Sequence, residues 1–164
     1  MVVSGSEVVL RSCHGASEYP ALVAIWRSAV DATHQFVSPD HLAEIEQAMA
    51  TDYFPAVDLT VAELDGRPVG FAGTSGHRLE MLFIEDDFRG RGIGSLLVDR
   101  VVREAGVTEV DVNEQNPQAA GFYDRKGFEV VGRSESDEAG YPYPLLHLRL
   151  RASASGVEDS STRT

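Results

Sequence analysis

A turn rich in glycine and arginine, Arg89–Gly94, contains the residue types that bind phosphate oxygens. It follows an apolar run, Leu79–Ile84, and it precedes residues with the apolar spacing of a helix. Glycines allow a backbone to approach a ligand closely, and successive amide N–H groups at a helix N-terminus form an anion site. The guanidinium groups of Arg89 and Arg91 add charge that complements phosphate oxygens. The turn therefore predicts a site for a phosphorylated ligand, and the alternative is a tight strand-to-helix turn with exposed arginines.

Other phosphate-binding and catalytic motifs do not fit this chain. A P-loop requires Gly-Lys-Ser/Thr, and no lysine lies near the turn. The dinucleotide-binding fingerprint needs a glycine at the position of Leu97, and a serine-hydrolase elbow needs one at the position of His77. We expect no metal site because the histidines show no metal-ligand spacing; they are His14, His34, His41, His77 and His147.

A second segment that could do chemistry, Asn116–Phe128, has the start signals of a helix. Asn116 is a favourable N-cap, and Pro117 stands at the first helical position, where proline is well tolerated. The helix would carry Tyr123. A tyrosine hydroxyl stays protonated at neutral pH and can act as an acid. The alternative role of Tyr123 is that of a core aromatic beside Phe122.

Together, these two segments resemble the GNAT (GCN5-related N-acetyltransferase) superfamily. The sequence Arg89-Gly90-Arg91-Gly92-Ile93-Gly94 is similar to the acetyl-coenzyme A loop of that family. The segment Asn116–Phe128 is similar to its N-x-x-A-x-x-F-Y-x-x-x-G-F motif, and the two motifs occur in the family order. The resemblance extends from about Val8 to Arg151 and implies an acetyl-coenzyme A-dependent N-acetyltransferase.

The resemblance also implies where the cofactor binds. The pyrophosphate would lie on the amides of the glycine-rich turn, and the pantetheine arm would pair with the preceding strand like an added strand. That strand would carry a bulge and splay away from Val107–Asn113, which opens a slot for the cofactor. The residues implied in binding acetyl-coenzyme A are Leu82, Phe83, Ile84, Arg89, Gly90, Arg91, Gly92, Ile93, Gly94, Asn116 and Tyr123.

In the family mechanism, an amine attacks the thioester directly within a ternary complex. Tyr123 matches the position that protonates the leaving thiolate, and a second group must deprotonate the amine. Asp111 lies twelve residues before Tyr123, the spacing at which some ribosomal-protein acetyltransferases carry a glutamate base. Glu80, on the strand beside the expected slot, is the other candidate base. Either carboxylate could instead be an exposed strand residue, and a chain of water molecules is a further route for the proton.

The family architecture places the acceptor amine among the first two helices, a loop at Tyr141–Pro144 and the splayed strands. The side chains expected to wall this pocket are Trp26, His34, Phe36, Tyr141 and Tyr143. Their alternative roles are core packing for the aromatic residues and a structural hydrogen bond for His34.

The composition limits the class of partner. The net charge is −12, from 14 Lys and Arg against 26 Asp and Glu, which argues against a nucleic-acid surface. No Lys or Arg lies between Arg27 and Arg67, where eight acidic residues fall, so this segment would attract a cationic partner or simply form a solvated face. No apolar run approaches the ~18 residues of a membrane span, and a single cysteine, Cys13, favours a reducing cytoplasm.

The elements that must position these residues follow from hydrophobic periodicity. Helical spacing runs from Tyr19 to Val37 and again from Pro39, and the helix after the glycine-rich turn should bury Ile93, Leu96, Leu97, Val101 and Ala105. Asp65-Gly66 predicts a hairpin turn, and Leu79–Ile84 has the continuous apolar character of a central buried strand. The expected strands are Val8–Arg11, Asp58–Leu64, Pro68–Gly73, Leu79–Ile84, Val107–Val112, Phe128–Gly132 and Leu145–Leu150.

We therefore predict an α/β (α+β) GNAT fold in one domain, residues 1–151, followed by a disordered Ser/Thr-rich tail, residues 152–164. Its sheet would be single, central, twisted and mostly antiparallel, with helices on both faces. The predicted activity is N-acetylation of a primary amine, with a protein lysine as the first candidate acceptor. The alternatives are a small acceptor of the polyamine or aminoglycoside type and a non-catalytic acyl-coenzyme A sensor, and either a monomer or a homodimer is compatible with the sequence.

Overall fold

The structure is a computed structural model that describes residues 7–33, 37–138 and 140–151. The chain forms two compact units, Met1–Val107 and Thr108–Thr164. The single domain expected over residues 1–151 stays a prediction, and the expected tail, residues 152–164, lies outside the described residues.

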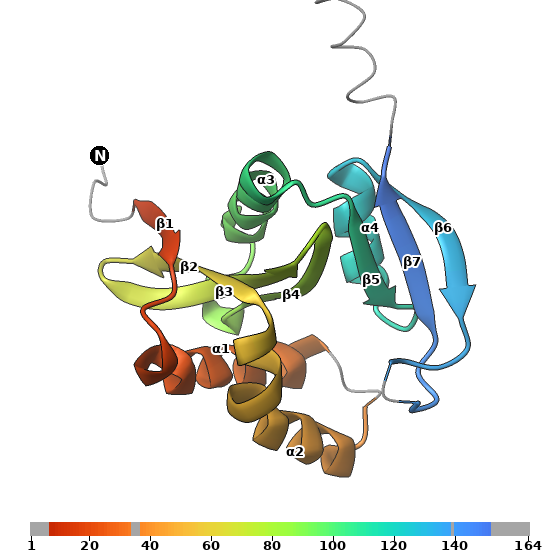
Figure 1. The fold of residues 1–164 in the computed structure, drawn as a ribbon, viewed down its shortest axis with the longest axis horizontal. Coiled ribbons are helices and arrows are strands. Elements are labelled where there is room, and N and C mark those ends of the chain that lie inside the picture. The colour runs from red at the N-terminus through yellow and green to blue at the C-terminus, as the bar shows by residue number, and fades with distance from the viewer. Residues whose placement is uncertain (1–6, 34–36, 139, 152–164) are drawn as a thin grey trace, which may run out of the picture. The chain divides into compact units, whose positions relative to one another are not determined.

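The first unit contains an antiparallel sheet in which successive strands are neighbours (Figure 1). Both residues of the turn Asp65-Gly66 have positive φ, 54° and 79°, as the predicted hairpin requires. The turn connects one strand in which polar and apolar residues alternate to one that is apolar along most of its length, so the sheet can bury both faces. The strands are β1 (Val8–Ser12), β2 (Asp58–Leu64), β3 (Arg67–Ser75) and β4 (Arg78–Ile84).

Helices cover both faces of this sheet. Helix α1 (Tyr19–Thr33) and helix α3 (Ile93–Ala105) both contact β3 and β4, and Figure 1 shows them on opposite sides. Helix α2 (Pro39–Ala48) begins as predicted, because the Ser38 side chain accepts a hydrogen bond from the His41 amide at 3.2 Å. Short 3-10 helical turns are η2 (Ala16–Glu18), η4 (Phe54–Ala56) and η5 (Asp86–Phe88), and η3 (Met49–Tyr53) is a π-helical segment.

The core of the first unit joins α1 and α2 to the sheet. The rings of Phe54 and Phe71 meet edge to face with centroids 5.6 Å apart. Two side chains expected to be buried on α3 are not: Leu96 is 45% exposed and Ala105 is exposed. The core cluster consists of Leu22, Ile25, Trp26, Val30, Leu42, Met49, Phe54, Val61 and Phe71.

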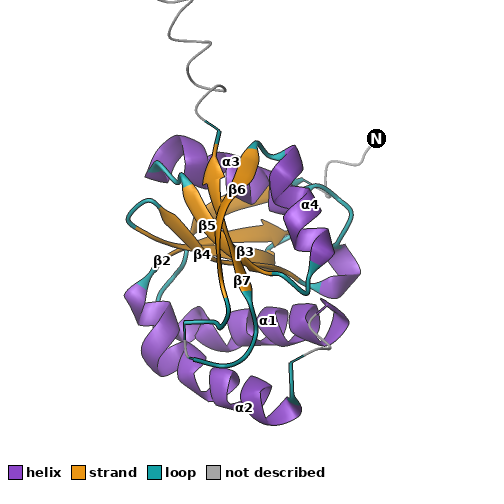
Figure 2. Cartoon of the chain, turned by 90° about the vertical axis from the view of Figure 1, so that its right-hand side faces the viewer, coloured by secondary structure: helices purple, strands orange, loops and turns teal. Residues whose placement is uncertain are grey.

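The second unit is a three-stranded antiparallel sheet with one helix. Strand β7 (Leu145–Leu150) lies between β5 (Glu109–Asn113) and β6 (Phe128–Ser134). Helix α4 (Pro117–Arg125) contacts β5 and β6 and lies beside these strands in Figure 2. The buried apolar side chains of this unit are Val110, Val112, Tyr123, Phe128, Leu145 and Leu148.

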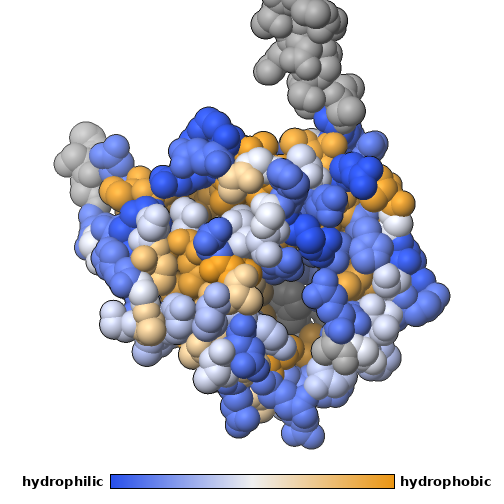
Figure 3. Space-filling view, in the orientation of Figure 1, coloured by the Kyte–Doolittle hydropathy of each residue, from blue (hydrophilic) through white to orange (hydrophobic). Residues whose placement is uncertain are grey.

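These elements confirm the predicted α+β class with mostly antiparallel pairing. The predicted opening between β4 and β5 concerns both units and stays a prediction. Hydrophilic residues cover most of the face drawn in Figure 3, where hydrophobic residues form separate patches. Within the described ranges, no helix is long and apolar enough to cross a membrane.

Candidate active site

The glycine-rich turn places a residue without a side chain at the N-cap of α3. Gly92 is the N-cap residue with φ 81° and ψ 7°, and its carbonyl accepts the first helical hydrogen bond, from the Leu96 amide at 3.1 Å. Gly90 also has a positive φ, 79°. Residues with a side chain rarely adopt this backbone conformation, so both positions require glycine. A helix N-terminus of this kind presents N–H groups and the positive end of the helix dipole to an anion.

Phe88 supports the arginines around this turn. The guanidinium carbon of Arg91 lies 4.9 Å from the centroid of the Phe88 ring, and that of Arg67 lies 5.1 Å from it. Arg67 also donates to the Glu85 carboxylate at 2.7 Å. Arg89 lies 3.6 Å from Asp86 in an exposed ion pair. The turn therefore carries positive charge held in place by aromatic and acidic neighbours.

The strand that leads into the turn is more accessible than its apolar sequence predicts. Only Leu79 is fully buried on β4, whereas the residues from Met81 to Ile84 are half-buried, so the expectation of a fully buried strand was wrong. The pairing with β3 skips Glu80, which confirms an irregularity of the bulge type in this strand. Glu80 is exposed and its carboxylate lies 3.4 Å from the Arg78 guanidinium.

The end of β4 is held in a defined position. The Glu85 amide donates to the Val69 carbonyl at 2.9 Å, and the Asp86 amide donates to the Ser28 hydroxyl at 3.0 Å. A Cβ at Gly70 would lie 2.7 Å from the Ile84 side chain, so a glycine is needed for β3 and β4 to pack here. The side chain of Ile93 is buried, so any ligand contact from this residue uses its backbone amide.

In the second unit, Asn116 and Tyr123 lie on the same helix. The Asn116 side chain accepts a hydrogen bond from the Ala119 amide at 3.3 Å, which confirms its predicted role as the N-cap of α4. Tyr123 is only 6% exposed and its ring meets those of Phe122 and Phe128 at 5.0 and 5.7 Å. Burial raises the pKa of Tyr123 well above its usual value, so the hydroxyl stays protonated at neutral pH.

Asp111 forms a hydrogen-bonded trio with two residues that the sequence analysis did not assign to the site. His147 Nδ1 lies 2.7 Å from Asp111 Oδ1, and His147 Nε2 lies 2.6 Å from Ser134 Oγ. The three residues come from β5, β7 and β6. Sequence spacing could not reveal them, because it does not contain the register that pairs Asp111 with His147. The one sequence signal for this trio was the alternation of side chains along each strand, which places every second residue on the same face.

The residues expected to line an acceptor pocket lie in different parts of the structure. Trp26 is 3% exposed in the core of the first unit, so it contributes packing and not an accessible wall, because its helix buries this face against the sheet. His34 and Phe36 lie outside the described residues. Tyr141 and Tyr143 are half-buried, with ring centroids 6.2 Å apart, and the Tyr141 amide donates to Asp137 at 2.8 Å.

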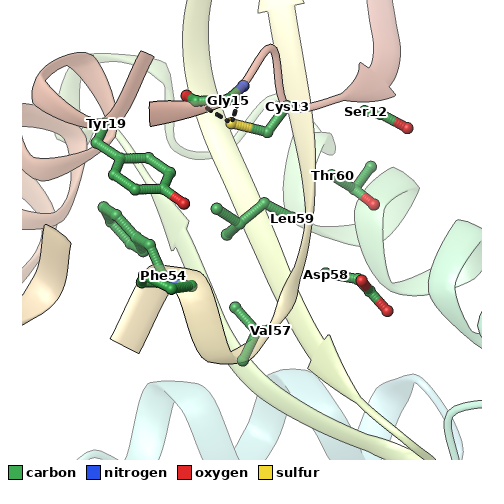
Figure 4. Close-up of a pocket in the computed structure, with 10 residues that line it drawn as sticks. Ser12, Cys13, Gly15, Tyr19, Phe54, Val57, Asp58, Leu59 and Thr60 are labelled. Carbon is green, nitrogen blue, oxygen red and sulfur yellow. Dashed lines mark hydrogen bonds between the residues drawn. The ribbon is translucent and has the colours of Figure 1, made fainter. Parts of the chain in front are cut away.

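A surface hollow of about 400 Å³ lies elsewhere on the first unit, among residues of β1, β2 and the short turns (Figure 4). Cys13 lies at its edge, and the Gly15 amide donates to the Cys13 sulfur at 3.5 Å. Burial raises the pKa of the Cys13 thiol, which lowers its reactivity. None of the residues predicted for cofactor or acceptor binding lines this hollow.

Comparisons with known proteins agree with these features. A profile of the acetyltransferase (GNAT) domain matches residues 24–145. Peptidyl-lysine N-acetyltransferase YjaB of Salmonella typhimurium is 48% identical over 141 residues, which cover 85% of this chain and 95% of that protein. The Escherichia coli protein of the same name is 46% identical over 150 residues, which cover 90% of this chain and 97% of that protein.

Solved structures support the same assignment. The solution structure of apo-form YjaB from Escherichia coli matches with a TM-score of 0.80 and 43% identity, covering 87% of this chain and 97% of that chain. PaiA N-acetyltransferase from Thermoplasma acidophilum, solved in complex with coenzyme A, has the same fold with a TM-score of 0.68 at 15% identity. The fold is that of an acyl-group transferase. The chain belongs to the GNAT family of N-acetyltransferases, as its two motifs predicted.

Proposed function

We propose that this chain transfers the acetyl group of acetyl-coenzyme A to lysine side chains of proteins. The observation that supports this most is the turn before α3, in which Gly90 and Gly92 have positive φ and the N-cap residue, Gly92, has no side chain to cap the helix. Family membership supports acetyl-coenzyme A as the ligand, and two relatives are named peptidyl-lysine acetyltransferases. The acidic segment between Arg27 and Arg67 favours a cationic acceptor.

The residues divide the work of cofactor binding. The amides from Gly92 onward and the guanidinium of Arg91 would hold the pyrophosphate, because both provide positive charge at a helix N-terminus. The half-buried backbone from Leu82 to Ile84 would pair with the amide groups of the pantetheine arm. Holding the thioester in this way lowers the entropic cost of its reaction with the amine.

The reaction then needs an acid and a base. The amine nitrogen forms a bond to the acetyl carbonyl carbon, and the carbon–sulfur bond breaks. Tyr123 donates its proton to the leaving thiolate, a role that its raised pKa supports because the hydroxyl is fully protonated at neutral pH. Asp111 and Glu80 are the carboxylates proposed near the amine, and Glu80 already lies within 3.4 Å of an arginine.

An acceptor screen tests this function. Purified protein and acetyl-coenzyme A are mixed with lysine peptides blocked at the α-amine, with spermidine, or with an aminoglycoside, and free thiol is measured over time. The expected result is acceptor-dependent thiol release with the lysine peptide. The mass of the peptide should rise by about 42 daltons, because one acetyl group replaces one hydrogen on the lysine. Thiol release only with spermidine or the aminoglycoside would mean that the acceptor is a small amine and not a protein lysine. Coenzyme A binding without release with any amine would support the sensor function instead.

A further inference from the structure

The trio of Asp111, His147 and Ser134 is built by the register of the second unit's sheet. Asp111 pairs with His147 between β5 and β7, and His147 pairs with Gly132 between β7 and β6. Paired residues share a face of an antiparallel sheet, and Ser134 lies two residues beyond Gly132 on that face. The three side chains are therefore brought together by strand pairing and not by a flexible loop.

A bulge in β6 brings Ser134 to this face. The register shifts by one residue between Val130 and Gly132, so that Gly132, and not Val131, lies opposite His147. A Cβ at Gly132 would lie 3.4 Å from His147 Cδ2, which means that the imidazole packs over the β6 backbone at this glycine. Without the shift, Ser134 would point to the opposite face.

The chemistry of the groups determines the direction of each hydrogen bond. An ionised carboxylate only accepts, so His147 Nδ1 carries the proton and donates to Asp111 Oδ1 at 2.7 Å. His147 Nε2 then has a lone pair and accepts from the Ser134 hydroxyl at 2.6 Å. The side chains of Asp111 and His147 are 14% and 35% exposed, so the carboxylate is shielded and the imidazole still reaches solvent.

We propose that His147, acting through the Ser134 hydroxyl, takes the proton from the acceptor ammonium, and that Asp111 positions the imidazole. This inference rests on the proposed function and reassigns its base. An imidazole is by type a better proton acceptor near neutral pH than a carboxylate is. Asp111 Oδ1 already accepts the Nδ1 proton, so it stabilises the imidazolium that forms.

The proton balance of the step is complete. One ammonium proton passes to Ser134 Oγ while the Ser134 hydroxyl proton passes to His147 Nε2, and the imidazolium later releases it to water. The free amine then attacks the acetyl carbon. The attacking nitrogen then loses a second proton, which passes through water to Tyr123 and replaces the proton that Tyr123 gave to the thiolate. The products are an amide, a thiol and one proton.

The same three residue types activate serine nucleophiles in hydrolases, but the setting of Ser134 differs. A nucleophilic serine needs amide N–H groups aimed at a developing oxyanion, as on a strand-to-helix turn. Ser134 is the last residue of strand β6, in register with Leu145, and among the described residues between it and β7 there is no helix. The relay is therefore the favoured role, and nucleophilic attack by Ser134 becomes an outcome of the test.

Other charged residues lie on the same face of this sheet. Glu109 and Glu129 are both in register with Arg149, which lies two residues from His147 on the same strand. Arg133 belongs to the opposite face, where it donates to Glu114 and Glu135 at 2.8 and 2.9 Å.

Rates of acetyl transfer to a lysine peptide between pH 6 and 10 test the relay. The variants are His147→Gln, Ser134→Ala and Asp111→Asn, with His14→Gln as the matched control, since the His14 side chain is 65% exposed in the other unit. We expect His147→Gln to lower kcat/KM about 100-fold at pH 7. The deficit should shrink toward pH 10, where the acceptor amine loses its proton without help. His14→Gln should match the wild type, and coenzyme A affinity should stay the same in all variants.

Two kinetic or labelling results overturn the relay. One is an unchanged pH profile in His147→Gln while Asp111→Asn loses its acidic limb, which would make Asp111 the base. The other is labelling of Ser134 by a fluorophosphonate, which would make it a nucleophile. The ¹⁵N spectrum of the wild-type imidazole gives a test that needs no variant: Nδ1–H supports the relay, and Nε2–H contradicts it. A wild type that binds coenzyme A but transfers to no amine defeats the proposed function, whereas the ¹⁵N result still decides the tautomer.

Discussion

Tyr123 is a buried residue of α4 for which we propose a role in proton transfer. Its ring packs against Phe122 and Phe128, and it is 6% exposed. Because burial raises its pKa, the phenolate is disfavoured and the hydroxyl serves as a donor over the whole working range of pH. The structure therefore shows the core packing of this ring, and its proposed role as the acid stays a prediction.

Removing the Tyr123 hydroxyl should separate catalysis from binding. Tyr123→Phe keeps the ring contacts but cannot protonate the thiolate, so we expect kcat to fall about 100-fold or more with little change in coenzyme A affinity. Thiol release measures the first quantity and calorimetry the second. Tyr53→Phe is the control, because Tyr53 is 40% exposed in the other unit. Equal turnover in Tyr123→Phe and wild type would remove this residue from the mechanism.

At the scale of elements, a network of ion pairs joins β1 to β2 and to the start of α1. The Arg11 guanidinium donates to Glu18 at 2.5 Å and to Glu63 at 2.6 Å. This arginine lowers the pKa of Glu18 to about 2, and the Glu18 side chain is 9% exposed. The pair therefore connects a strand to the short turn that precedes α1.

The Arg11–Glu18 pair should make stability depend on pH in the acidic range. The folded-state pKa of Glu18 is about 2 and its ordinary value is 4.5, so its stabilising effect is present above pH 4.5 and is lost as the pH falls toward 2. Glu18→Gln should lower the free energy of unfolding by about 2 kcal/mol at pH 7 and by much less near pH 2. Urea unfolding measures both values. Glu7→Gln, an exposed position, should change neither, and a pH-independent loss in Glu18→Gln would contradict the assignment.

The glycines of the turn before α3 provide a second prediction at this scale. Gly92→Ala places a side chain at φ 81°, where it meets no protein atom within 4 Å but strains the backbone by about 1–2 kcal/mol. Gly76→Ala is the matched control, with φ 59° and equally open space, in the turn between β3 and β4. Both variants should lose similar stability, but only Gly92→Ala should lose coenzyme A affinity, by 10-fold or more in calorimetry. Equal affinity in the two variants would mean that the cofactor does not approach this turn.

At the scale of the whole molecule, charge is unevenly distributed. Several acidic residues of the segment between Arg27 and Arg67 are neutralised: Arg27 pairs with Asp31 and Glu46 at 3.1 and 2.7 Å. Five others in this segment remain exposed, namely Asp40, Glu44, Asp52, Asp58 and Asp65. The structure therefore reduces the acidic surface that the sequence suggested but does not remove it.

This surface should affect the choice of acceptor. We expect a lysine peptide with basic neighbours to have a several-fold higher kcat/KM than one with acidic neighbours at low salt. Raising the salt concentration to about 0.5 M should reduce the difference, because it shortens the screening length to a few ångströms. Steady-state kinetics at two salt concentrations measure this. A preference for acidic neighbours would contradict electrostatic attraction by this segment.

The local features of the fold could be predicted because neighbouring residues determine them. Asp65-Gly66 marked a hairpin, Asn116 marked the start of α4, and Leu145–Leu150 was predicted with the bounds that the structure has. Burial on α3 was predicted less well. Ile93, Leu97 and Val101 repeat every four residues and define the buried stripe, whereas Leu96 lies off that stripe and is exposed.

Sequence alone determined the family and indicated the proposed phosphate-binding turn and the candidate acid, because each depends on residues that are close together in the chain. Tertiary structure decided which groups surround Asp111, since His147 and Ser134 lie 36 and 23 residues away in sequence and meet it only through strand register and a bulge. It also decided that Trp26 packs in the core. The physical reason is that hydrogen-bond partners and burial depend on long-range pairing, and a shift of one residue in register would turn each of these side chains to the other face.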